Sequence, residues 1–331
     1  IQKDLDDGID TIGKKMTVCQ LYAKQIRHRG NVRYNTKNGR KRLMKLLEED
    51  KLGGCPIDSV KLSDAKEWAI RMKEKGISYK TISNDKRSLK AAFYTAIQDD
   101  CIRKNPFDFQ LNTVIEDDTE PKVPLTPAQE ESFLSFAQND KVYQKYYAEL
   151  IILLGTGLRI SELCGLTDTD INFENRIINV DHQLLRSAET GYYIETPKTK
   201  SGIRQIPMSE KVYEAFNRVL KRRRGAKAVT IDGYSNFLFL NRDGYPKTAT
   251  NYDGMFRGLA KKYNKYHEEA LPKVMTPHTL RHTFCTNMAN AGMNPKALQY
   301  IMGHSNITMT LNYYAHATFD SAKAEMLRIA A

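Results

Sequence analysis

A short acidic stretch divides this chain into two basic parts. Residues 111–124 carry four acidic residues and two prolines, a composition that interrupts helices and predicts a linker. Residues 1–110 contain 24 Lys and Arg against 15 Asp and Glu, and residues 121–331 contain 27 against 20. Two basic domains on either side of an acidic linker suit a polyanion such as a nucleic acid.

The first part reads as a small helical domain over residues 1–110. Apolar residues recur at helical spacing in residues 16–28, 34–49, 63–72 and 78–98, and Asn105-Pro106 closes the segment. The last of these helices carries four basic residues on one flank: Lys80, Lys86, Arg87 and Lys90. These side chains can bind the DNA phosphates beside a major groove, or they can form an ordinary solvent-exposed helix face. The sequence leaves both interpretations open.

The second part, residues 125–316, mixes helices with short strands. Thr126, Pro127 and Gln129 form a helix start with a capping box. Helices are predicted over 142–154, 209–222, 249–263 and after Thr276 and Asn294, and short strands over 176–180, 192–196, 203–206 and 237–240. The predicted fold class is mainly α with a small β-sheet. Residues 317–331 form a tail with apolar residues at helical spacing.

Several classes of protein are disfavoured. The five cysteines are scattered without a CxxC pair, which argues against a disulfide framework or structural zinc and favours a reducing cytoplasm. No apolar run approaches the roughly 20 residues that span a bilayer, so no membrane partner is expected. No signal-peptide pattern follows Ile1, and the missing start methionine leads us to expect an internal fragment of a longer chain.

The residues whose side chains could take part in a reaction concentrate between Thr276 and His316. His278 and Arg281 lie three residues apart on one helix face, His304 follows a glycine, and two tyrosines come next. Singly, each such residue is usually structural. Together with Arg159 and a lysine near residue 200 they meet the requirements of phosphoryl transfer without a metal: cations for the phosphate, a tyrosine nucleophile and a proton donor. We find no carboxylate cluster suited to two metal ions, and we expect no cofactor.

Five segments, in this order, give the chain its resemblance to a known family: TGLRISELCGL, TPKTKSGIRQIP, TPHTLRHTF, IMGHSNITMT and TLNYYAH. With them the chain resembles a tyrosine recombinase of the phage-integrase type, most similar to integrases of conjugative transposons of Gram-positive bacteria. The resemblance implies a helical, SAM-like core-binding domain followed by an α+β catalytic domain.

The resemblance also implies a role for each residue. The phosphate is bound by Arg159, Arg281 and His304; protons are handled by His278 and Lys198; and Tyr314 is the nucleophile that forms a 3′-phosphotyrosyl link. Two assignments have competitors. Tyr313 is adjacent to Tyr314, which is favoured because Tyr-x-His is completed by His316, and Lys200 competes with Lys198.

Members of this family clamp double-stranded DNA between two domains and assemble as tetramers on two duplexes, exchanging strands through a Holliday junction. The expected function is therefore integration and excision of a mobile element, a form of transposition, with an excisionase or a DNA-bending protein as accessory partners. The tail is expected to pack on a neighbouring protomer. A type IB topoisomerase-like relaxing enzyme and a catalytically silent DNA-binding regulator are the alternatives.

Overall fold

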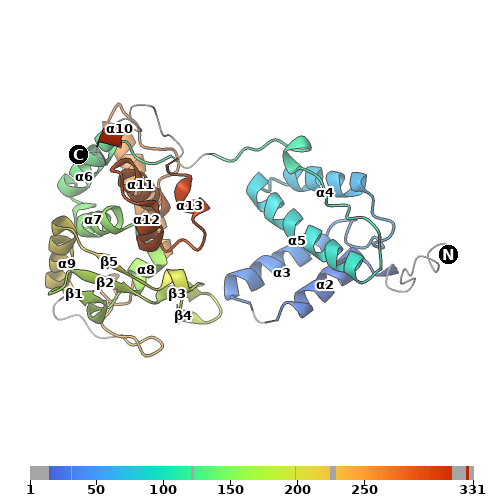
Figure 1. Cartoon of the computed structure of the whole chain (residues 1–331), viewed down its shortest axis with the longest axis horizontal. Coiled ribbons are helices and arrows are strands. Elements are labelled where there is room, and N and C mark those ends of the chain that lie inside the picture. The colour runs from blue at the N-terminus through green and yellow to red at the C-terminus, as the bar shows by residue number, and fades with distance from the viewer. Residues whose placement is uncertain are drawn as a thin grey trace. The chain divides into compact units, whose positions relative to one another are not determined.

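The computed structural model describes residues 15–30, 32–120, 123–197, 199–223, 229–314 and 326–327. The contacts divide the chain into two compact units, Ile1–Pro121 and Lys122–Ala331, and this boundary falls within the predicted linker. Both units are drawn in Figure 1. Among the described helices, none combines the length and the apolar character that crossing a membrane requires. The predicted tail lies outside the described residues except for Met326 and Leu327.

The first unit is a helical bundle. Its helices are α2 (Val18–His28), α3 (Tyr34–Glu48), α4 (Leu62–Glu74) and α5 (Tyr79–Gln98). Helix α2 begins after Thr17, whose hydroxyl accepts from the backbone of Gln20, and so starts two residues later than the apolar spacing predicts. Trp68 packs edge-on against Phe107, which also contacts the ring of Phe93. All three rings are fully buried.

The second unit is mainly helical. Its helices are α6 (Pro127–Asn139), α7 (Tyr147–Thr156), α8 (Ile160–Gly165), α9 (Glu210–Arg223), α10 (Ala249–Tyr266), α11 (Pro277–Asn290), α12 (Pro295–Met302) and α13 (Thr308–Leu311). Helix α7 is almost wholly apolar, because it lies at the centre and packs against α9 and α11 (Figure 1). The predicted helix over 142–154 is wrong at its start, since Asp140 accepts the first backbone N–H groups and a 3₁₀ turn precedes α7.

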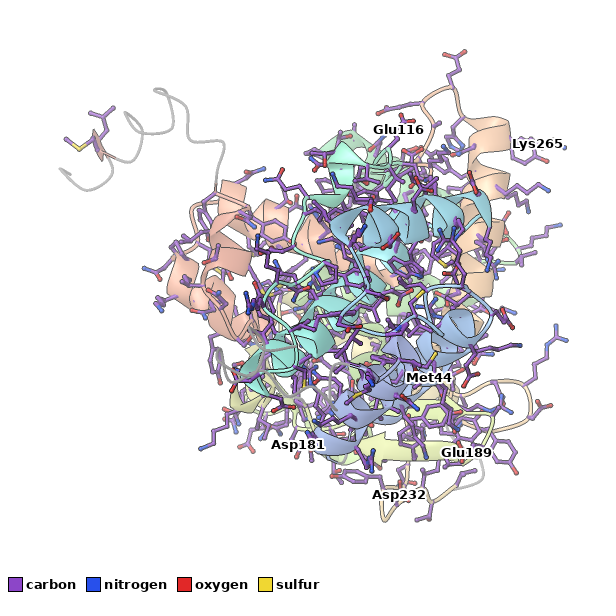
Figure 2. All side chains as sticks on the ribbon, turned by 90° about the vertical axis from the view of Figure 1, so that its right-hand side faces the viewer. Met44, Glu116, Asp181, Glu189, Asp232 and Lys265 are labelled. Carbon is purple, nitrogen blue, oxygen red and sulfur yellow. The ribbon has the colours of Figure 1, made fainter. Side chains whose placement is uncertain are left out.

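The strands form two separate antiparallel sheets. One contains β1 (Ile171–Asn172), β2 (Ile177–Val180) and β5 (Arg204–Pro207) in the order β1-β2-β5, and the other pairs β3 (Gln183–Ser187) with β4 (Gly191–Glu195). Glu189 marks the turn between β3 and β4 in Figure 2. The same figure labels Lys265, which is exposed near the end of α10. The predicted strand 237–240 is wrong: this segment makes only isolated bridges, to Thr167 and to Pro246.

This topology corrects the interpretation of the lysine-containing turn. If the predicted strands 192–196 and 203–206 paired with each other, Lys198 and Lys200 would lie at the tip of a hairpin. The structure pairs β4 with β3 and β5 with β2, so the segment between β4 and β5 connects two sheets. Sequence patterning missed β3 because its residues alternate weakly between apolar and polar.

Gly157 ends α7 and turns the chain toward α8. Its backbone is left-handed, with a φ of 63°, and a Cβ placed on it would lie 2.4 Å from Cδ1 of Phe284. Only glycine satisfies both demands, because other residues are strained at this φ and no room exists for a side chain. The packing of α11 on the end of α7 therefore depends on this position.

We expect Gly157→Ala to lower the free energy of unfolding of the second unit by about 2–5 kcal/mol, from backbone strain plus overpacking. Gly292→Ala is the matched control. Gly292 has a φ of 79°, but a Cβ there would meet nothing within 4 Å, so only the strain of about 1–2 kcal/mol applies. Denaturant unfolding of both variants checks this, and equal losses would contradict the packing argument.

Candidate active site

Two arginines that the sequence singled out converge in the second unit, although they lie far apart in the chain. Arg159 caps the start of α8, and its Nη2 donates to the carbonyl of Gly303 at 3.0 Å. Arg281 lies on α11 and donates from Nη1 to the carbonyl of Gly157 at 2.5 Å and from Nη2 to that of Met302. Both guanidinium groups thus meet where α7 and α12 end.

A third arginine completes this arrangement. Arg204, at the start of β5, has a fully buried side chain and donates from Nε to the carbonyl of Ile301 at 2.6 Å. Three successive carbonyls at the end of α12 therefore accept from three different arginines. The pairs are Ile301 with Arg204, Met302 with Arg281, and Gly303 with Arg159.

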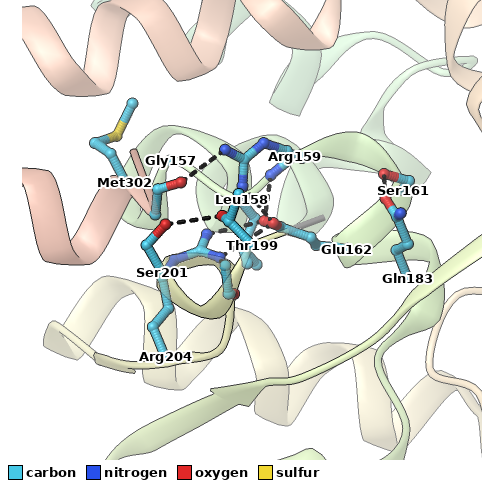
Figure 3. A network of polar contacts seen from close by, with 12 residues as sticks. Gly157, Leu158, Arg159, Ser161, Glu162, Gln183, Thr199, Ser201, Arg204 and Met302 are labelled. Carbon is cyan, nitrogen blue, oxygen red and sulfur yellow. Dashed lines mark hydrogen bonds and ion pairs between the residues drawn. The ribbon is translucent and has the colours of Figure 1, made fainter. Parts of the chain in front are cut away.

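One buried carboxylate lies among these cations. The side chain of Glu162 is 3% exposed and contacts Arg159 at 2.7 Å and Arg204 at 2.9 Å (Figure 3). Burial opposes its ionisation, but the hydrogen bond from Arg204 and the neighbouring arginine charges outweigh burial and lower its pKa to about 2. Burial and the Arg159 charge lower the pKa of Arg281 to about 9, which leaves this arginine protonated at neutral pH.

His304 follows Gly303, the residue that caps the end of α12, and is 5% exposed. Burial and then the charges of Arg281 and Arg159 lower its pKa to about 4, so the ring is neutral at pH 7. Its Nδ1 lies 3.0 Å from the hydroxyl of Thr310. A neutral imidazole in this position can donate one hydrogen bond to an anion held by the two arginines.

His278 lies in the first turn of α11 and is exposed. It is close enough to His304 for its charge to contribute to the lowered pKa of that ring. The structure therefore brings together four residues from three parts of the sequence: Arg159 before α8, His278 and Arg281 on α11, and His304 after α12.

The two tyrosines come just after α13 and are partly buried against the apolar cluster formed by α11 and α12. The hydroxyl of Tyr314 donates to the carbonyl of Met293 at 2.5 Å. The ring of Tyr313 packs edge-on against His282, 4.9 Å between centroids. Burial and the nearby Cys285 raise the pKa of both hydroxyls, and only at Tyr313 does Arg281 act in the opposite direction.

Among the described residues, neither tyrosine is hydrogen-bonded to an arginine or histidine of this cluster. The structure therefore places both near the cluster without choosing between them. Lys198 lies outside the described residues, whereas Lys200 is exposed in a 3₁₀ turn before β5.

The four basic residues predicted to bind DNA lie on α5 in the first unit, but they do not form one set. Lys80 and Arg87 are exposed on the side of the helix opposite its buried face. Lys90 contacts Asp108 at 2.5 Å, and Lys86 lies over the ring of Phe109. The segment after α5 therefore covers part of the predicted flank.

Sequence reasoning missed Glu162, Arg204 and Thr310. Glu162 follows Arg159 at the capping-box position, three residues later, which is a usable local signal. Arg204 stood beside the lysine turn in the sequence, but its partner lies 42 residues away. Nothing in one sequence shows that such a pair is buried.

We expect Glu162→Gln to lower the free energy of unfolding by about 3–5 kcal/mol at pH 7, because it leaves the buried Arg204 without its counter-charge. The carboxylate has a lower pKa folded than unfolded, so its stabilisation is present above about pH 4.5 and is lost as the pH falls toward 2. The difference between wild type and variant should therefore shrink in acid. Urea unfolding at pH 7 and pH 3 measures this, with the exposed Glu174→Gln as control. A constant difference would contradict the assignment.

Comparison with known proteins gives one consistent result. The model of the phage integrase family matches residues 124–321. The transposase from transposon Tn916 of Enterococcus faecalis is 68% identical over 329 residues, covering 99% of this chain and 81% of the transposase. The Tn1549 transposon integrase, solved with a circular intermediate DNA, is 78% identical with a TM-score of 0.90, covering 95% of this chain and 99% of that one. In its complex with transposon right end DNA, the same integrase is 78% identical with a TM-score of 0.89, covering 96% of this chain and 100% of that one. This chain belongs to the phage integrase family.

Proposed function

We propose that this protein is a site-specific DNA recombinase that integrates and excises a mobile element through a 3′-phosphotyrosyl intermediate. The observation that carries the proposal is the convergence of Arg159, Arg281 and the neutral His304 beside a pair of tyrosines. The Tn1549 integrase, solved with circular intermediate and transposon-end DNA, supports DNA as the substrate.

The arginines suit a phosphodiester in its transition state. A guanidinium group has five N–H donors, and Arg281 uses two of them on backbone carbonyls. The remaining donors of Arg281 and Arg159 can neutralise the non-bridging oxygens as charge develops. Because carbonyl contacts fix both groups beforehand, little reorganisation is needed during the reaction.

We propose Tyr314 as the nucleophile, with Tyr313 as the alternative. The Tyr-x-His pattern completed by His316 supports Tyr314. Attack requires its hydroxyl to leave the carbonyl of Met293 and lose its proton, for which we propose His278 as acceptor. Tyr313 has the advantage of lying within the electrostatic influence of Arg281.

The leaving 5′ oxygen requires a proton donor. We propose Lys198 for this role, as the resemblance of its TPKT segment to the family implies, and we keep Lys200, which is exposed in the 3₁₀ turn before β5, as the alternative. No metal or cofactor enters this scheme, because the cations and proton carriers are all side chains.

A nicked suicide duplex carrying the recombination site tests the nucleophile. In buffer with chelator, wild-type protein should form a covalent protein–DNA adduct, Tyr314→Phe should form none, and Tyr313→Phe should remain within about tenfold of wild type. The Phe variants keep the ring and remove only the hydroxyl, so packing is conserved. Loss of the adduct in Tyr313→Phe alone would transfer the role to Tyr313.

The same assay separates the alternative functions. A silent DNA-binding regulator would give no adduct with any variant. A relaxing enzyme would form the adduct and relax supercoiled DNA, but it would not exchange strands between two sites. Strand exchange between a circular intermediate and a target duplex is therefore the result that identifies a recombinase.

We propose that the first unit binds duplex DNA through the exposed Lys80 and Arg87, with a smaller part for Lys86 and Lys90. Asp108 already neutralises Lys90 and desolvation lowers the pKa of Lys86, so both are poorer partners for a phosphate. Lys80→Ala and Arg87→Ala should each reduce the salt dependence of DNA binding by about one released counterion, and Lys90→Ala by less. Binding isotherms at several salt concentrations check this, and equal slopes for all three would contradict it.

We propose in addition that the protein assembles as a tetramer on DNA, with residues 317–331 packing on a neighbouring protomer and with an excisionase or DNA-bending protein directing the reaction. Sedimentation of the DNA complex with and without residues 319–331 tests the assembly, and an unchanged complex would contradict it.

The five cysteines are free thiols, which suits the reducing cytoplasm where we place the protein. Cell fractionation checks that location.

A further inference from the structure

We propose that Thr310 is a positioning residue that fixes the tautomer of His304, donating its hydroxyl proton to Nδ1 so that the ring carries its own proton on Nε2. The inference rests on the proposed function, which places a DNA phosphate against this ring. Thr310 was not among the residues that the sequence indicated.

The geometry holds both partners in place. The side chain of Thr310 is completely buried and its hydroxyl lies 3.0 Å from Nδ1 of His304. The backbone of His304 is fixed on both sides by Gln299, whose carbonyl accepts from its N–H at 3.1 Å and whose side-chain amide donates to its carbonyl at 3.0 Å. The backbone N–H of Thr310 donates to Ile307 in the first turn of α13. The ring and the hydroxyl thus meet in one defined orientation.

The partners available to the Thr310 hydroxyl determine which group donates in its hydrogen bond with Nδ1 of His304. Within the described part of the chain, the hydroxyl of Thr310 has no partner other than Nδ1. If Nδ1 carried the proton and donated it, the buried hydroxyl proton would have no acceptor, which costs about 1–3 kcal/mol. If the hydroxyl donates, both the proton and the ring nitrogen are satisfied. The second arrangement is therefore preferred, and the ring proton is left for Nε2.

The charges around the ring make this choice matter. Burial, and then the charges of Arg281, Arg159 and Arg204, lower the pKa of the imidazole, so the neutral ring has one N–H and not two. Within the described residues Nε2 makes no hydrogen bond, so its proton is the one that a phosphate oxygen can accept. With the other tautomer, Nε2 would present a lone pair to an anion, which is repulsive. The Thr310 hydroxyl thereby determines whether Nε2 of His304 donates a hydrogen bond to the substrate phosphate or repels it.

Two substitutions separate this role from simple packing. Thr310→Val keeps the shape of the side chain and removes the hydroxyl, whereas Thr310→Ser keeps the hydroxyl and removes a buried methyl group. A structural role would make cleavage follow stability, so the serine variant would be affected at least as much as the valine variant. The tautomer role reverses this order.

The first measurement uses no DNA. Long-range proton–nitrogen correlation spectra of the full chain with ¹⁵N-labelled histidine, with His304→Gln to assign the signal, report which nitrogen carries the proton. We expect Nε2–H in wild type and in Thr310→Ser, and a shifted Nδ1 resonance in Thr310→Val from loss of the hydrogen bond. A proton on Nδ1 in wild type would overturn the proposal.

The second measurement is single-turnover cleavage of the suicide duplex, with DNA affinity measured in parallel. We expect Thr310→Val to cleave at least about tenfold more slowly while binding DNA within about twofold of wild type, and Thr310→Ser to cleave within about threefold. Wild-type cleavage by Thr310→Val, or losses in both variants that follow their melting temperatures, would refute the tautomer role. If wild type itself formed no adduct, the proposed function would fail, while the nitrogen spectra would still decide the tautomer.

Discussion

The last turn of α12 is the feature on which the candidate site depends. Helix ends leave carbonyl groups without intrahelical partners, and here the carbonyls of residues 301, 302 and 303 each accept from a different arginine. The negative end of the helix dipole favours these cations. Helix α7 contributes in the same way through the carbonyl of Gly157. Backbone groups that need donors are thus used to place side chains that need acceptors.

The charges in this layer do not balance. Within the described residues, Arg159, Arg204 and Arg281 share one carboxylate, that of Glu162, which leaves an excess of positive charge among these buried groups. Buried charge without a partner is costly, and the carbonyl contacts offset only part of that cost. An anion would complete the layer. The proposed phosphate binding therefore rests on the whole arrangement and not on any one of its residues.

The sequence predicted well what local physics controls. Capping residues such as Thr126 with Pro127, and apolar residues at helical spacing, located most helices, and the four residues Arg159, His278, Arg281 and His304 do come together. Prediction from the sequence failed where contacts between distant segments determine the structure. The pairing of β4 with β3, the burial of Arg204 against Glu162, and the return of residues 105–109 over Lys86 and Lys90 all depend on tertiary contacts. A single sequence gives no measure of such contacts.

The contacts of the arginines also link residues that are far apart in the chain. Arg281 bonds to a carbonyl 124 residues earlier, and Arg159 to one 144 residues later. Contacts of this length slow folding, because the entropy of closing long loops must be overcome before they stabilise the fold. During synthesis the arginine cluster therefore cannot exist until α12 has left the ribosome. A growing or partly unfolded chain can carry every one of these side chains and still lack the site.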